Sequence, residues 1–222
     1  MTNRVHPFLW WGIPVLLMIS QILCEIFVPT EMKPAFFSEE GPHEKVQALI
    51  MLIAFVFAVR VFLTVEGVWL KLWFGIAALG SLYVGGEETS WGQTYLHWGT
   101  PESWMAINDQ AETNLHNTSD WLDQKPKILL EIGVLVGGII VPALARWKPH
   151  KLPSRFAAIY PTWQTSVAAG TALTLKIIDT VQDRVDGHLF WRISEAIEIF
   201  VYYFVLIYLI EMLRRFKSRA QE

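Results

Sequence analysis

Long apolar stretches separated by short polar ones dominate this chain. A membrane has a hydrocarbon core about 30 Å thick, and a helix needs roughly 20 mostly apolar residues to cross it. Six stretches reach about that length, at residues 8–29, 46–66, 68–87, 128–147, 158–179 and 189–213. The fifth is the most polar of them, so it should face protein or water rather than lipid. The pattern predicts an all-α integral membrane protein with about six transmembrane helices in one bundle.

Composition leaves little material for anything else. Of the 222 residues, 53% are apolar and 11 are tryptophan. We therefore expect residues 1–222 to form a single polytopic membrane domain. The lone Cys24 excludes an internal disulfide and a CxxC zinc or redox site. A nucleotide-binding loop is also missing from the sequence, so any chemistry should proceed without ATP bound by this chain.

Charge is distributed unevenly between the two ends of the predicted helices. If six helices alternate, one side carries 11 Lys and Arg with three acids, and the other carries seven cations with 18 acids. Lys and Arg are enriched in the cytoplasmic loops of membrane proteins. The sequence thus predicts that both termini lie in the cytoplasm and that the acidic side faces outward. The basic clusters are short and lie next to the membrane, so nucleic acid is not an expected partner, whereas lipid, a second copy or another membrane protein is.

The connection between the third and fourth predicted helices, at about residues 88–126, is too long for plain coil. Four tryptophans recur along it, and tryptophan is enriched at the depth of lipid headgroups. Thr100 followed by Pro101 is typical of a helix start. We expect an interfacial helical segment here.

Carboxylates cluster at the acidic side. Because an ionisable group is costly in hydrocarbon, Glu195 and Glu198, which lie in an otherwise apolar run, should face a protein interior or a wet cavity. Glu112 and His116 would share a helix face, as would Asp179 and Asp183. Carboxylates with one imidazole suit a divalent metal ion. The candidate metal ligands are Glu88, Glu112, His116, Asp179, Asp183, Glu195 and Glu198. The candidate catalytic residues are Glu87, Glu88, Glu112, His116 and Glu195.

Three sequence blocks carry a resemblance to a known family. They are GEETSWGQ at residues 86–93, TPE at 100–102 and ETNLHN at 112–117. The chain resembles a family of uncharacterised bacterial multi-pass membrane proteins that share a GEExSWGQ block, a following TPE and an NLHN block. The resemblance covers roughly residues 39–117. It implies a fold with several membrane helices in the bacterial inner (plasma) membrane, with the acidic side facing the periplasm or exterior, and no established activity.

Three kinds of function fit these patterns. The first is a metal-assisted hydrolase or transferase that acts at the outward-facing surface of the membrane. The second is a non-enzymatic membrane subunit or assembly protein, in which the same polar groups form a structural hydrogen-bond network. The third, an ion or proton pathway, is less favoured because the cytoplasmic half of the predicted helices offers few polar positions.

Overall fold

The computed structural model describes residues 5–38, 41–108, 112–185 and 189–219. Within these ranges the chain is helical and contains no β-strand, which confirms the predicted all-α class. The side chains of His116, Asp120 and residues 122–124 also lie outside the part of the chain that the structure describes.

The helices follow one another in a simple order. The first long helix consists of η1 (Phe8–Gly12) and α1 (Ile13–Phe27), and α2 (Lys33–Phe36), α3 (Pro42–Thr64) and α4 (Val68–Glu87) come next. Only short pieces follow α4, namely η2 (Ser90–Gly92), α5 (Gln93–Leu96), α6 (Glu102–Met105) and η3 (His116–Thr118). A kinked long helix then comprises α7 (Asp120–Leu135), η4 (Val136–Ile140) and α8 (Val141–Trp147). The turns η5 (Pro149–Lys151), η6 (Ser154–Phe156) and η7 (Trp163–Thr165) lead to α9 (Ser166–Gln182) and α10 (Ile193–Arg219).

Five of the helices in the described ranges are long and apolar enough to cross a membrane. They are Phe8–Phe27, Pro42–Thr64, Val68–Glu87, Lys125–Trp147 and Ile193–Arg219. The predicted fifth segment, 158–179, differs from its expected form. Its first eight residues form turns, and α9 contributes only 17 helical residues. Partners on α10 hold these residues outside a helix, because the Thr162 N–H donates to Glu211 and the Ile159 carbonyl accepts from Tyr208.

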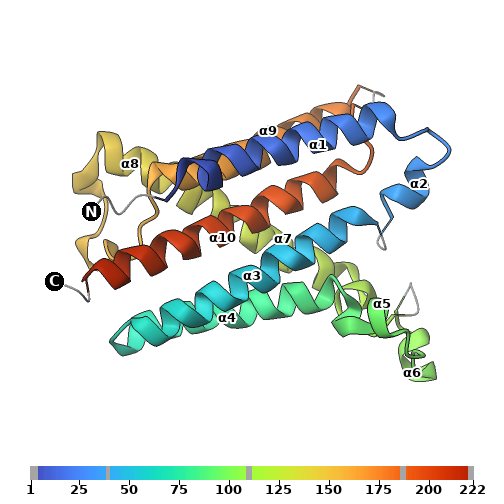
Figure 1. The fold of residues 1–222 in the computed structure, drawn as a ribbon, viewed down its shortest axis with the longest axis horizontal. Helices are drawn as coiled ribbons and strands as arrows, with labels where there is room; N and C mark the ends of the chain where they lie inside the picture. The colour runs from blue at the N-terminus through green and yellow to red at the C-terminus, as the bar shows by residue number, and fades with distance from the viewer. Residues whose placement is uncertain (1–4, 39–40, 109–111, 186–188, 220–222) are drawn as a thin grey trace.

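Long helices that follow one another along the chain alternate in direction, as Figure 1 shows. Helices α1, α4 and α9 run one way, and α3, α7 and α10 run the other way. We call the end where α4 terminates and α3, α7 and α10 begin the acidic end. The opposite end, where η1 begins and α10 terminates, is called the basic end.

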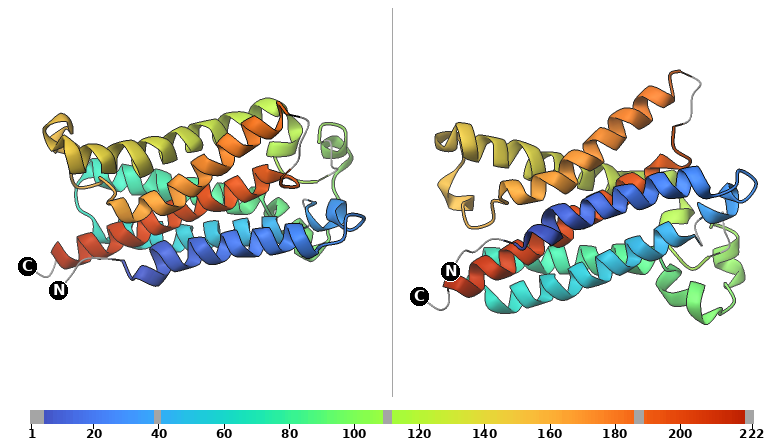
Figure 2. Two further views of the ribbon diagram at one scale, coloured as in Figure 1. Left: turned by 90° about the horizontal axis from the view of Figure 1, so that it is seen from above. Right: turned by 45° about the horizontal axis from the view of Figure 1, so that its top comes forward.

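Helix α10 forms the centre of the bundle. Of its most apolar stretch, 83% is buried inside the protein, against 11% for the Phe8–Phe27 helix. The views in Figure 2 show α10 flanked by α1, α3 and α9. A helix that is apolar all round and buried all round belongs in the core, so its polar residues need partners from the protein. This requirement applies to Glu195, Glu198 and Glu211.

One glycine sets the spacing around α10. A Cβ atom on Gly138 would lie 2.2 Å from the Cβ of Ala169 and 2.9 Å from the Phe204 ring. Only glycine lets η4 approach α9 and α10 this closely, as small residues commonly do between membrane helices.

The connection after α4 is not the interfacial helix that the tryptophan spacing predicts. Ser90, Trp91 and His97 have φ angles of 45°, 58° and 53°, and Gly92 has a φ of 100°. Residues in this left-handed region end a right-handed helix. The segment therefore folds as tight turns, and α6, after Pro101, lasts only four residues.

Candidate functional site

A polar cavity opens at the acidic end of the bundle. Its volume is about 370 Å³, within the range of small-molecule sites. The walls come from the end of α4, the first half of α7, the start of α10 and Lys176 of α9. Its charged and hydroxyl-bearing lining residues are Glu44, Tyr83, Glu87, Glu88, Lys127, Glu131, Lys176, Arg192, Ser194, Glu195, Glu198 and Tyr202.

Two of these carboxylates meet at one hydroxyl group. The Tyr202 hydroxyl donates to Glu88 Oε1 at 3.0 Å and lies 3.4 Å from Glu198 Oε2. Glu198 also forms an ion pair with Lys127, whose Nζ is 3.0 Å from Oε1. Helix α10 supplies the middle of this chain of contacts, and its two ends come from Glu88, directly after α4, and from Lys127 of α7. Glu198 and Tyr202 are four residues apart, which places them on the same face of α10.

Glu88 differs electrostatically from an ordinary carboxyl group. Burial of its carboxyl, together with the nearby negative charge of Glu198, holds the pKa of Glu88 well above the ordinary value of 4.5. The hydrogen bond from Tyr202 and the charge of Lys127 oppose this rise only in part. A hydroxyl group carries one proton and cannot donate to two carboxylates at once. The Tyr202 hydroxyl therefore satisfies only one of the two carboxylates at a time, and a proton on Glu88 removes the repulsion between them.

Glu195 has a separate set of partners one turn earlier on α10. Its Oε1 lies 2.9 Å from Arg192 Nη2, and its Oε2 accepts a hydrogen bond from Gln47 Nε2 at 3.1 Å. Gln47 is fully buried on α3 and also donates to the backbone carbonyl of Glu195 at 3.0 Å. Arg192 donates to the carbonyl of Phe37 at 2.9 Å, which ties the start of α10 to the segment before α3.

The blocks that carry the family resemblance fold against each other beside the cavity. Glu87 accepts from Trp91 Nε1 at 2.6 Å and from the Leu115 backbone N–H at 2.7 Å. The Asn114 side chain donates to Ser90 Oγ at 2.9 Å and to Glu112 Oε2 at 2.8 Å. Ser90 Oγ also donates to this same oxygen of Glu112. Together these bonds join the first and third blocks.

Gln93 connects the remaining block to this network. Its side-chain carbonyl accepts from the Thr113 N–H at 2.7 Å, and its amide group donates to Thr100 Oγ1 at 2.7 Å. Asn108 donates to the side chain of Asn114 at 2.9 Å, and its Oδ1 accepts from the Glu112 N–H at 3.1 Å. We call this set, Glu87, Ser90, Gln93, Asn108, Glu112 and Asn114, the loop network. It closes the long connection against the end of α4.

The structure brings together some of the predicted site residues and separates others. Glu87, Glu88, Glu195 and Glu198 line the cavity. Glu112 is not among the lining residues and belongs to the loop network. Asp179 and exposed Asp183 lie at the end of α9, and neither lines the cavity. The His116 side chain lies outside the described part of the chain.

No metal-ligand cluster is present among the described residues. Nowhere in that part of the chain are three or more His, Cys, Asp or Glu side chains grouped so that they could hold a metal ion. Of the seven predicted ligands, the six whose side chains the structure describes are spread over the cavity, the loop network and the end of α9. What the cavity itself assembles is a set of paired carboxylates, suited to proton transfer.

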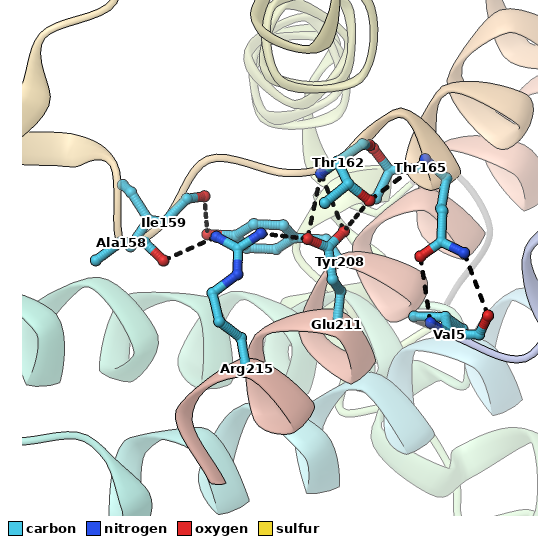
Figure 3. Close-up of polar contacts among 9 residues, drawn as sticks. Val5, Ala158, Ile159, Thr162, Thr165, Tyr208, Glu211 and Arg215 are labelled. Atoms are coloured by element: carbon cyan, nitrogen blue, oxygen red, sulfur yellow. Dashed lines mark hydrogen bonds and ion pairs between the residues drawn. The ribbon is translucent and has the colours of Figure 1, made fainter. Parts of the chain in front are cut away.

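A second polar cluster, at the basic end, was not singled out by the sequence (Figure 3). Glu211 is 2% exposed, and its carboxylate accepts from the Thr162 N–H at 3.2 and 3.1 Å and from Thr162 Oγ1 at 3.1 Å. It is also ion-paired with Arg215, which donates to the Ala158 carbonyl at 3.0 Å. Figure 3 shows these groups converging on the connection that precedes α9. The pattern Glu-x-x-x-Arg near the end of an apolar helix was the available signal.

Comparison with known proteins adds no identification: no protein-family model, curated protein or solved structure matches the chain. Membership of the family that the three blocks suggest stays a prediction.

Proposed function

We propose that the chain is an integral protein of a bacterial inner membrane and crosses it six times, with α9 as the sixth span. Five apolar helices, the alternating helix directions and the excess of Lys and Arg at the basic end support this topology. In this arrangement both termini lie in the cytoplasm and the cavity opens toward the periplasm.

Within that frame, we propose a hydrolase or transferase that uses acid–base catalysis on a membrane-borne amphiphile. One observation carries the proposal: Glu88 and Glu198 share the Tyr202 hydroxyl inside a cavity, and only Glu198 is ion-paired with Lys127. Two carboxyl groups whose surroundings favour opposite protonation states are the usual arrangement of an acid and a base.

The roles follow from these surroundings. Glu198, ionised beside Lys127, removes a proton from the attacking water or hydroxyl group. Glu88, protonated because its carboxyl is buried, gives its proton to the leaving group. Tyr202 connects the two and allows the proton to return from Glu198 to Glu88 after turnover. Glu195, Arg192 and Gln47 hold the start of α10 against α3. These steps use only the chain's own residues and require no metal ion.

The experiment is a turnover assay with the protein reconstituted in vesicles that contain a radiolabelled membrane lipid extract. Release or transfer of a labelled polar group is measured for wild type, Glu88→Gln, Glu198→Gln and Glu66→Gln. Glu66 is exposed at the basic end, so its variant is the matched control. We expect the first two variants to lose about 10²- to 10⁴-fold in rate and the control to match wild type.

A non-enzymatic membrane subunit is the second candidate, and the loop network favours it. The conspicuous sequence blocks bond to each other, as a purely structural device would. A folded wild type without turnover, or unchanged rates in Glu88→Gln and Glu198→Gln, would contradict the enzyme and leave this candidate.

A further inference from the structure

A second, apolar cavity continues from the polar one. It has a volume of about 180 Å³ and is lined by eight apolar residues of α7, α9 and α10 and by Glu131 and Lys176. Four of these residues, Glu131, Lys176, Ile197 and Val201, also line the polar cavity. The two spaces therefore share one wall and lie along α7, α9 and α10. We call the second space the apolar groove.

The sequence explains why the groove exists. α9 presents Ala169 and Ala172 to it, whose small side chains do not fill the space. α9 also diverges from α10 toward its C-terminal end, as the right-hand view of Figure 2 shows. Leu173 is 38% exposed on the rim of the groove, at the level of the predicted hydrocarbon core, so a lipid chain can enter from the side.

An ion pair marks the boundary between the two spaces. Lys176 Nζ lies 3.1 Å from Glu131 Oε1, and these side chains are 49% and 33% exposed. Such an exposed pair is worth little and can exchange partners. Beyond it, the polar cavity is lined by five further glutamates and by two cations, Lys127 and Arg192. An anionic headgroup would meet a surplus of carboxylates, whereas an ammonium group would find partners, and a phosphate at the boundary would meet Lys176.

We infer that the two cavities together bind one aminophospholipid, with its ammonium group among the glutamates of the polar cavity, its phosphate at Lys176 and one acyl chain in the apolar groove. This inference names the substrate class of the proposed enzyme and rests on that function. The groove adds little affinity of its own, because an acyl chain leaves an equally apolar bilayer when it enters. Selectivity between lipids comes from contacts with the headgroup, and the groove fixes the position of the bound lipid.

The test is native mass spectrometry of the intact protein after release from vesicles. The vesicles contain phosphatidylcholine with equal small amounts of phosphatidylethanolamine and phosphatidylglycerol. Leu173→Trp fills the groove from its exposed rim. Ile177→Trp is the matched control, because Ile177 is one turn further along α9, is 57% exposed and does not line the groove. Size-exclusion profiles and melting temperatures show that each variant is folded.

We expect wild type and Ile177→Trp to retain phosphatidylethanolamine about tenfold over phosphatidylglycerol, and Leu173→Trp to lose this lipid about tenfold. Equal retention of the two lipids, or full retention in Leu173→Trp, would overturn the inference. Glu88→Gln separates it from the proposed function, because the neutral amide replaces an acid that is already protonated. We expect that variant to bind the lipid normally while failing to turn it over, so loss of activity and loss of binding are distinguishable.

Discussion

At the scale of single residues, the local rules of packing explain the most distinctive block of the sequence. Gly86 leaves room for the Trp91 ring, whose nearest carbon would lie 2.8 Å from a Cβ placed there. The ring position lets Trp91 donate to Glu87, which in turn accepts from Leu115. The left-handed φ angles of Ser90 and Trp91 are the cost of this tight turn.

Gly86→Ala should destabilise the protein by about 2 kcal/mol, because the added methyl group forces the Trp91 ring away from Glu87. Gly80 lies on the same helix, and a Cβ placed there would have no atom within 4 Å apart from those of its chain neighbours and the nearby helix backbone. Gly80→Ala should therefore change stability by less than about 0.5 kcal/mol. Thermal unfolding in detergent measures the difference. Equal melting temperatures for the two variants would contradict the packing argument.

Glu88 makes stability depend on pH in an unusual direction. In the unfolded chain it titrates at its ordinary pKa of 4.5, and in the folded protein burial raises that pKa. The folded state therefore holds the proton more tightly, and the contribution of Glu88 to stability falls as pH rises from about 4.5 to the folded pKa. Across this window, the melting temperature of wild type relative to Glu88→Gln should decrease with pH and then level off. A difference that stays constant or increases would contradict the assignment.

At the scale of elements, the length of the apolar stretches and the positions of the charged residues between them predicted where most long helices lie. A helix must be long enough to cross the hydrocarbon core, and charged groups are costly inside it. The ends were less predictable. Pro126 lies inside α7, which starts at Asp120 rather than at 128, and residues 158–165 are held as turns by partners on α10. The loop network could not be predicted from spacing, because it pairs residues of two separate blocks through left-handed turns. For the same reason the sequence predicted Glu112 as a site residue, although it belongs to the loop network.

The cluster around Glu211 ties α10 to the connection before α9. Glu211→Gln keeps the side-chain shape but removes the charge that compensates Arg215, so it should cost about 3 kcal/mol. Exposed Glu66 lies at the same end of the bundle, and Glu66→Gln should cost almost nothing. Chemical denaturation of both variants in detergent gives the comparison. A loss below about 1 kcal/mol for Glu211→Gln would show that the cluster contributes little to stability.

At the scale of the whole molecule, topology decides which compartment the cavity serves. Charge asymmetry alone predicted the orientation, and the alternating helices place the carboxylates of the cavity at one end. The sequence predicted that Glu88, Glu195 and Glu198 lie at one level, because their positions along the predicted helices place them near the same end. Their partners Gln47, Lys127 and Tyr202 could not be predicted. The rotation of each helix about its axis and the identity of its neighbours depend on packing, which the sequence pattern does not determine.

Single cysteines test the orientation. In a Cys24→Ala background, Glu102→Cys lies at the acidic end and Ser218→Cys lies at the basic end. A membrane-impermeant maleimide applied to intact bacterial cells, after the outer membrane is permeabilised, should label the cysteine at 102 and spare the cysteine at 218 until the cells are lysed. The opposite labelling would invert the topology and place the cavity in the cytoplasm.

The protonation state of Glu88 tests the account most directly. Infrared difference spectroscopy across a pH titration should show, at neutral pH, the C=O band of a protonated carboxylic acid in wild type and in Glu66→Gln. That band should be missing in Glu88→Gln and should disappear from wild type only well above pH 4.5, the ordinary value for glutamate. If wild type and Glu88→Gln give the same spectra, Glu88 holds no proton, and the acid–base pair at the centre of the proposed function does not exist.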